Sequence, residues 1–177
     1  MAVIKIRNTN EVIEGQDRVG AFLQNEGVLY EHWDVEKLPT SLKGNCHVTE
    51  EQKNEILSVF DDDIRSLAKR NGYGNWDVVA LSEQTPDLDK ILKKFEQVHV
   101  HTEDEVRAIT AGHGIFIIKG SVGYFDVELD PGDVISVPVD TPHFFTLMDD
   151  RQVVAVRLFI DPSGWVAHPY EEKESVK

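Results

Sequence analysis

Residues 99–105 read HVHTEDE, and three of these side chains have the types and the spacing of metal ligands. In an extended strand, side chains two residues apart point to the same side, so His99 and His101 share a face. We expect the polar residues that follow to turn and to bring the Glu105 carboxylate beside the two imidazoles. Imidazole and carboxylate donors together suit a divalent first-row metal ion. The segment therefore predicts a metal site.

A fourth candidate ligand, His143, follows PGDVISVPVDTP, where an expected strand could return across the fold to the same point. Three imidazoles and a carboxylate on a six-coordinate ion leave two positions for a chelating substrate, or for a substrate and dioxygen. Zinc is also compatible, although four protein ligands would close a tetrahedral structural site. An iron–sulfur centre is disfavoured, because Cys46 is the single cysteine.

Two arginines are candidates for substrate contacts near this site. Arg107 has the strand parity of Glu105, so its side chain is expected to point inward. Arg157 lies within the apolar run VVAVRLFI, where a buried charge needs an anionic partner, which an anionic substrate would supply. The alternative for both is a structural ion pair. The remaining histidines lack ligand-like spacing and are interpreted as surface or hydrogen-bonded residues: His32, His47, His113 and His168.

The elements before Gln97 are expected to be mainly helical, with short strands between them. The clearest helix lies in VTEEQKNEILSVFDDDIRSLAKRNGYG, where Thr49 and Gln52 have capping-box spacing and apolar residues recur every three or four positions. A shorter helix is expected in TPDLDKILKKF, with Thr85 as its cap and Pro86 in its first turn. Both helices are interpreted as packing on a larger core.

The pattern changes at Gln97, after which short apolar or alternating runs are separated by turn sequences such as GSVG and DPGD. Several short strands with close turns predict an antiparallel barrel or jelly roll. We expect a single domain over residues 1–177. It would have a helix-rich part at 1–96, a barrel core at 97–169 and a mobile acidic tail at 170–177.

Composition narrows the classes of function. The formal net charge of −14 argues against nucleic-acid binding, which needs a basic face to neutralise phosphates. The first residues contain no long apolar run, so neither a signal peptide nor a membrane anchor is expected. With one cysteine the chain has no intrachain disulfide, which fits a cytoplasmic protein. No segment marks an obligate interface, and a monomer is expected.

Two longer segments resemble the cupin motifs. HVHTEDEVRAITAG resembles the first motif and GDVISVPVDTPH the second. Almost the whole chain, from Val3 to Pro169, further resembles the bacterial acireductone dioxygenase family, through stretches such as FLQNEGVLYEHWDVEKLP and VVAVRLFIDPSGWVAHP. Three positions depart from the usual pattern. Asp140 replaces a frequent glycine, Leu147 a frequent asparagine, and Val98 an acidic residue before the first ligand histidine.

The resemblance implies a mainly β fold, a cupin-type antiparallel β-barrel (jelly roll) with α-helices packed from the N-terminal half. It implies a dioxygenase of methionine salvage that oxidises the acireductone 1,2-dihydroxy-5-(methylsulfanyl)pent-1-en-3-one with O2. One Fe2+ or Ni2+ per chain would be held by His99, His101, Glu105 and His143, and Arg107 would help to form the substrate dianion. The implied pocket consists of Phe95, Arg107, Phe145, Arg157 and Trp165.

The implied products depend on the metal. The Fe2+ form would give formate and 4-methylsulfanyl-2-oxobutanoate, and the Ni2+ form would give formate, carbon monoxide and 3-(methylsulfanyl)propanoate. Three alternatives stay open from the residues alone. The first is another metal-dependent cupin dioxygenase or isomerase acting on a small oxo-acid. The second is a non-catalytic metal-binding cupin, and the third is a barrel without metal. Activity on acireductone and metal content separate these readings.

Overall fold

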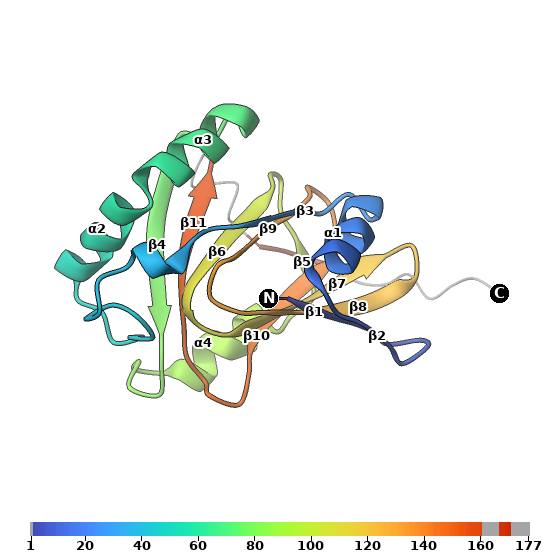
Figure 1. The fold of residues 1–177 in the computed structure, drawn as a ribbon. Helices are drawn as coiled ribbons and strands as arrows, with labels where there is room; N and C mark the ends of the chain where they lie inside the picture. Colours follow the sequence, from blue (N-terminus) through green and yellow to red (C-terminus); the bar gives the residue numbers. More distant parts are fainter. Residues whose placement is uncertain (1, 161–166, 171–177) are drawn as a thin grey trace.

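The computed structural model describes residues 2–160 and 167–170, and in this part of the chain two antiparallel sheets form the body of the molecule (Figure 1). The larger sheet has the order β12-β5-β10-β7-β8-β1-β2. Its strands are β1 (Val3–Ile6), β2 (Glu11–Ile13), β5 (His99–Val100), β7 (Gly114–Gly120), β8 (Gly123–Leu129), β10 (His143–Leu147) and β12 (His168–Pro169).

The smaller sheet has the order β3-β9-β6-β11-β4. Its strands are β3 (Leu29–His32), β4 (Asn75–Leu81), β6 (Glu105–Gly112), β9 (Asp133–Val137) and β11 (Val153–Phe159). Helix α1 (Gln16–Asn25), the 3-10 turn η1 (Val35–Lys37) and helices α2 (Glu50–Val59), α3 (Asp61–Asn71) and α4 (Leu88–Phe95) complete the described elements. The expected mainly β fold with helices from the first half is confirmed.

The smaller sheet is buried on both faces. Helices α2 and α3 lie along β4 and β11 (Figure 1), and they enclose an outer core that includes Phe60, Ile64 and Leu67. An inner core lies between the two sheets. Along β6, Val106 and Ala108 belong to the outer core and Ile109 to the inner core. Every residue of β6 is therefore buried. Because side chains alternate along a strand, Glu105 and Arg107 lie on the same side as Ile109 and face the space between the sheets.

The first half of the chain contributes more to the sheets than its pattern indicated. Strands β1 and β2 extend the larger sheet beyond β8, and β3 and β4 form the two edges of the smaller sheet. These pairings join segments far apart in the sequence, such as β4 with β11. Local periodicity cannot reveal the pairings of β1 with β8, of β3 with β9 and of β4 with β11, because the partners are far apart in the sequence.

The first predicted helix is divided in two at Phe60. Its N-terminus begins as expected, with a capping box in which Thr49 accepts from the Gln52 N–H and the Gln52 side chain accepts from the Thr49 N–H. Phe60 leaves the helical conformation and is completely buried in the outer core. The new helix α3 starts at Asp61 with three acidic residues in its first turn, which suit the positive end of a helix dipole. The prediction of one continuous helix was wrong.

The cap predicted for α4 was also wrong. The helix begins at Leu88 with Asp87 as its N-cap, and Asp87 has a left-handed backbone and makes no side-chain cap bond. The Thr85 hydroxyl instead accepts from the Ser82 N–H at 2.9 Å, so it closes a turn before the helix. The predicted apolar side holds, because Leu88 and Leu92 are buried in the inner core.

Replacing Thr49 by alanine should lower the free energy of unfolding by about 1 kcal/mol, because the Gln52 N–H loses its side-chain acceptor. Urea denaturation of the metal-free protein measures the change. Ser58→Ala, which removes an exposed hydroxyl from the same helix, is the control and should shift stability by less than about 0.5 kcal/mol. Equal effects of the two substitutions would contradict the capping role.

Cys46 should react slowly with thiol reagents while the protein is folded. The side chain is buried in the outer core, and burial, with a smaller effect from the Asp150 charge, raises the pKa of the Cys46 thiol from 9.0 to about 11. Only the thiolate is nucleophilic, so at pH 8 labelling should be at least ~100-fold slower in the native protein than in guanidinium chloride. A disulfide reagent that releases a chromophore measures both rates. Equal rates would show that the thiol is accessible.

None of the helices in the described ranges combines the length and the apolar character that crossing a membrane requires.

Candidate metal centre

Strands from both sheets bring the four candidate ligands together. His99 on β5 lies directly opposite His143 on β10, in the larger sheet. His101 follows β5, and after a bend the chain enters the smaller sheet at Glu105, the first residue of β6. The expected turn between His101 and Glu105 therefore carries the chain from one sheet to the other. The cluster lies where the two sheets meet.

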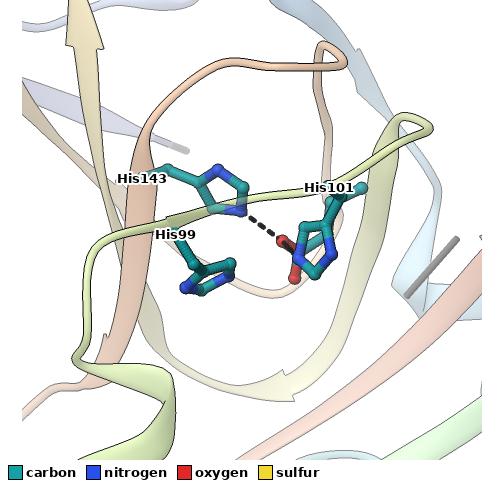
Figure 2. Close-up of side chains that lie close together, drawn as sticks. His99, His101 and His143 are labelled. Carbon is teal, nitrogen blue, oxygen red and sulfur yellow. Dashed lines mark hydrogen bonds and ion pairs between the residues drawn. The ribbon is translucent and has the colours of Figure 1, made fainter. Parts of the chain in front are cut away.

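The four side chains converge on one point. One potential ligand atom from each of them lies within 4.8 Å of all the others. The imidazole centroids are 4.5 Å apart for His99 and His143 and 4.8 Å apart for His99 and His101. Figure 2 shows the three rings pointing toward one another, with a contact between His143 and a carboxylate. The four residues expose only 1–6% of their surface, so a bound ion would be shielded from bulk water.

Backbone carbonyls fix the orientation of two of the rings. His99 Nδ1 donates to the Gln97 carbonyl at 2.6 Å, and His143 Nδ1 donates to the Thr141 carbonyl at 2.7 Å. A carbonyl can only accept, so Nδ1 carries the proton and the Nε2 lone pair is directed into the cluster. His143 Nε2 contacts Glu105 Oε2, and His101 Nε2 lies 3.1 Å from the same oxygen. Imidazole nitrogens and a carboxylate oxygen that approach one another in this way are typical of side chains that bind the same cation.

The charges of the cluster suit a divalent ion. Burial would raise the pKa of the Glu105 carboxyl. The nearby Arg107 charge overcomes this and holds that pKa well below its ordinary value. Burial lowers the pKa of His99, which favours the neutral form of its ring. An ionised carboxylate and a neutral imidazole are the forms that bind metal.

A profile of the ARD/ARD′ family matches residues 4–167. The chain belongs to the ARD/ARD′ family. It is 72% identical over 176 residues to the acireductone dioxygenase of Geobacillus kaustophilus strain HTA426, with 98% of each chain covered. It is 70% identical over 178 residues to that of Geobacillus thermodenitrificans strain NG80-2, with 99% of each covered.

A solved relative has the same fold as this ARD/ARD′ chain. The acireductone dioxygenase from Bacillus anthracis, whose active centre holds a cadmium ion, superposes with a TM-score of 0.92. It is 53% identical and the match covers 95% of this chain and 98% of that one. The cupin-type fold implied by the motifs is confirmed. In this chain, the four convergent donors form a candidate site for a metal ion.

Arg107 lies beside the cluster, as its strand parity predicted. Its Nε donates to Glu105 Oε1 at 3.0 Å, while Oε2 of the same carboxylate faces the imidazoles. Three phenylalanine rings surround the guanidinium, whose Cζ lies 4.8 Å from the ring of Phe145, 5.6 Å from that of Phe95 and 5.8 Å from that of Phe116. Cation–π contacts of this kind hold an arginine in one place. Phe95 and Phe145, predicted for the pocket, thus both contact Arg107.

Arg157 lies directly across the sheet from Arg107, on β11. Its guanidinium makes two hydrogen bonds to the Asp77 carboxylate on β4, at 2.8 and 2.6 Å. The protein itself therefore supplies an anionic partner for Arg157, as the ion-pair alternative predicted. The sequence analysis did not identify Asp77 as that partner. Trp165, the remaining predicted pocket residue, lies outside the described residues.

Two further residues near the cluster were missed. Phe116 is completely buried, and its ring centroid lies 6.0 Å from that of His143. Asp140 has a left-handed backbone with φ +54°, the conformation that a glycine at this position of the cupin motif adopts readily, and its N–H donates to the His101 carbonyl at 3.1 Å. The sequence contained one indication of this conformation, because Asp140 replaces a residue that is frequently glycine in the motif.

The other histidines lie outside the cluster. His113 contacts two carboxylates, with Nδ1 2.7 Å from Asp150 Oδ2 and Nε2 3.2 Å from Asp130 Oδ1. His47 Nδ1 is 3.1 Å from the Ser82 hydroxyl. His32 and His168 are exposed.

Proposed function

We propose that this protein is an acireductone dioxygenase of methionine salvage, with its chemistry at the cluster of His99, His101, Glu105 and His143. Its substrate is 1,2-dihydroxy-5-(methylsulfanyl)pent-1-en-3-one, an enediol whose carbon chain is cleaved with dioxygen. The proposal rests on two findings that concern the same residues of the chain. The buried donor set is complete, and it lies in a chain that matches acireductone dioxygenases over nearly its full length.

The metal we propose is Fe2+ or Ni2+, one per chain, because three imidazoles and a carboxylate suit both ions. When bound, the ion supplies a Lewis acid and a template for the oxygens of the enediol. The Fe2+-loaded protein is expected to form formate and 4-methylsulfanyl-2-oxobutanoate. The Ni2+-loaded protein is expected to form formate, carbon monoxide and 3-(methylsulfanyl)propanoate.

Arg107 is the proposed catalytic residue of the protein chain. Its positive charge lies 3.0 Å from Glu105 and is enclosed by aromatic rings, so its field is poorly screened by water. There it favours the anionic form of the enediol and stabilises that charge by charge-assisted hydrogen bonds. The proton that leaves the substrate passes to solvent.

The other proposed pocket residues are Phe95, Phe145, Arg157 and Trp165. Phe95 and Phe145 hold Arg107 in position, and the apolar surface they form suits a methylsulfanyl tail. Arg157 shares the inner face of the smaller sheet with Arg107 and forms an ion pair with Asp77. Trp165 is proposed from the family resemblance alone. We further propose a cytoplasmic monomer, which sedimentation equilibrium would report as a 20.0 kDa species.

Oxygen uptake tests the proposed substrate. Metal-loaded protein should consume oxygen rapidly with acireductone and at background rate with small oxo-acids such as oxalate or pyruvate, which lack the enediol. Protein stripped of metal by a chelator is the control and should be inactive until metal is restored. Uptake with an oxo-acid alone would favour another cupin enzyme. Bound metal without any uptake would favour a binding protein.

A further inference from the structure

The strand that carries His99 is short and has two neighbours. Strand β5 contains only His99 and Val100, and in the larger sheet it lies between β10 and β12. On one side His99 pairs with His143, another proposed ligand. On the other side it pairs with Pro169 of β12, a strand from the C-terminal end of the chain. Without β12, this two-residue strand would be the edge of the sheet, where backbone groups are open to water.

Tyr170 anchors β12 beside the cluster through three contacts. Its backbone N–H donates to the carbonyl of Val98, the residue before His99, at 3.1 Å. Its hydroxyl accepts from Lys119 Nζ at 3.0 Å, and the same ammonium lies 5.3 Å from the centroid of its ring. The Lys119 backbone N–H donates to the carbonyl of Pro142 at 2.9 Å, immediately before His143. Tyr170 therefore joins the backbone next to one proposed ligand to the backbone next to another.

We propose that Tyr170 is a positioning residue that holds β12 against β5 and thereby fixes the imidazole of His99 for the metal. The orientation of His99 depends on its hydrogen bond to the carbonyl of Gln97, in the same short segment. If this segment shifts, the ring loses its alignment with the other donors. Outer contacts of this kind typically change metal affinity 10–100-fold.

This role was not expected from the sequence, where Tyr170 was assigned to a mobile tail. In the described part of the chain, Tyr170 is bonded to Val98, just before β5, and to Lys119 of β7. The proposal rests on the ligand assignment of the proposed function, but not on the substrate. It predicts how fast metal is lost, which can be measured without any turnover.

The test is the rate at which Ni2+-loaded protein loses its ion to excess chelator, followed with a metal-sensitive dye. Tyr170→Ala should release Ni2+ about tenfold faster than wild type or more. Tyr170→Phe keeps the ring and the backbone N–H and should stay within about threefold of wild type. Lys119→Met removes the ammonium that contacts Tyr170 and should release Ni2+ faster than Tyr170→Phe does.

Hydrogen exchange separates positioning from general destabilisation. In Tyr170→Ala, amides of residues 98–101 should exchange faster, while those of β6 and β11, which are buried in the other sheet, should keep wild-type protection. Wild-type release and wild-type exchange in Tyr170→Ala would overturn the proposal. If that variant does not fold, Lys119→Met decides, because wild-type release from it would equally overturn the role. Failure of wild-type protein to bind Ni2+ at all would instead refute the ligand assignment.

Discussion

Replacing His99 by alanine is expected to remove most of the bound metal and to lower acireductone turnover by more than ~100-fold. Contacts outside the ligand set already change metal affinity 10–100-fold, so loss of a direct donor should cost more. The fold should survive, because His99 belongs to neither of the two apolar cores. Elemental analysis after gel filtration measures the metal, and circular dichroism of the metal-free variant measures the fold.

His32→Ala is the matched control for this result. It removes an imidazole from an exposed position on β3, outside the cluster. It should keep both metal and turnover at wild-type levels. Wild-type metal content in His99→Ala would contradict the ligand assignment. Metal loss in both variants would indicate an indirect effect of losing a histidine.

Replacing Arg107 by alanine is expected to keep the metal but to slow turnover by about 10²–10³-fold, the effect of losing one oxyanion-type donor. Metal should stay, because the ion itself can balance the Glu105 charge that Arg107 contacts in the structure. Steady-state kinetics of protein loaded with one ion per chain gives the rate. Because the charge acts on the reacting enediol, kcat should fall along with kcat/KM.

The control for Arg107 is Arg65→Ala on helix α3. Arg65 is 65% exposed and pairs with Asp61 one helical turn away, so its loss should leave kinetics unchanged. A wild-type rate in Arg107→Ala would exclude Arg107 from catalysis. If metal content fell together with the rate, Arg107 would act by holding Glu105 instead.

The candidate ligands could be predicted because strand geometry is a local property. Alternation of side chains from His99 to His101 places the two imidazoles on one side of the chain, and the polar bend after them returns the chain to Glu105. The inward direction of Arg107 follows from the same alternation along β6. His143 required the cupin motif as well, because nothing local says that β10 pairs with β5.

Other features depend on contacts between distant segments, which no short pattern encodes. Asp77 could not be recognised as the partner of Arg157, because the two meet only when β4 pairs with β11. The division at Phe60 could not be recognised, because the apolar stripe continues through this residue into the outer core. The contact of Tyr170 with Val98 was likewise not predicted, because the two meet only when β12 pairs with β5.

The most direct test of the account is anaerobic reconstitution of metal-free protein with Fe2+ or, separately, with Ni2+, followed by acireductone and oxygen. Loss of the enediol absorbance and identification of the products are measured for each ion. The account predicts decay far above the spontaneous rate with both ions, with carbon monoxide from the Ni2+ form only. No acceleration by protein that holds one ion per chain would contradict it and would mean that this cluster serves a different reaction.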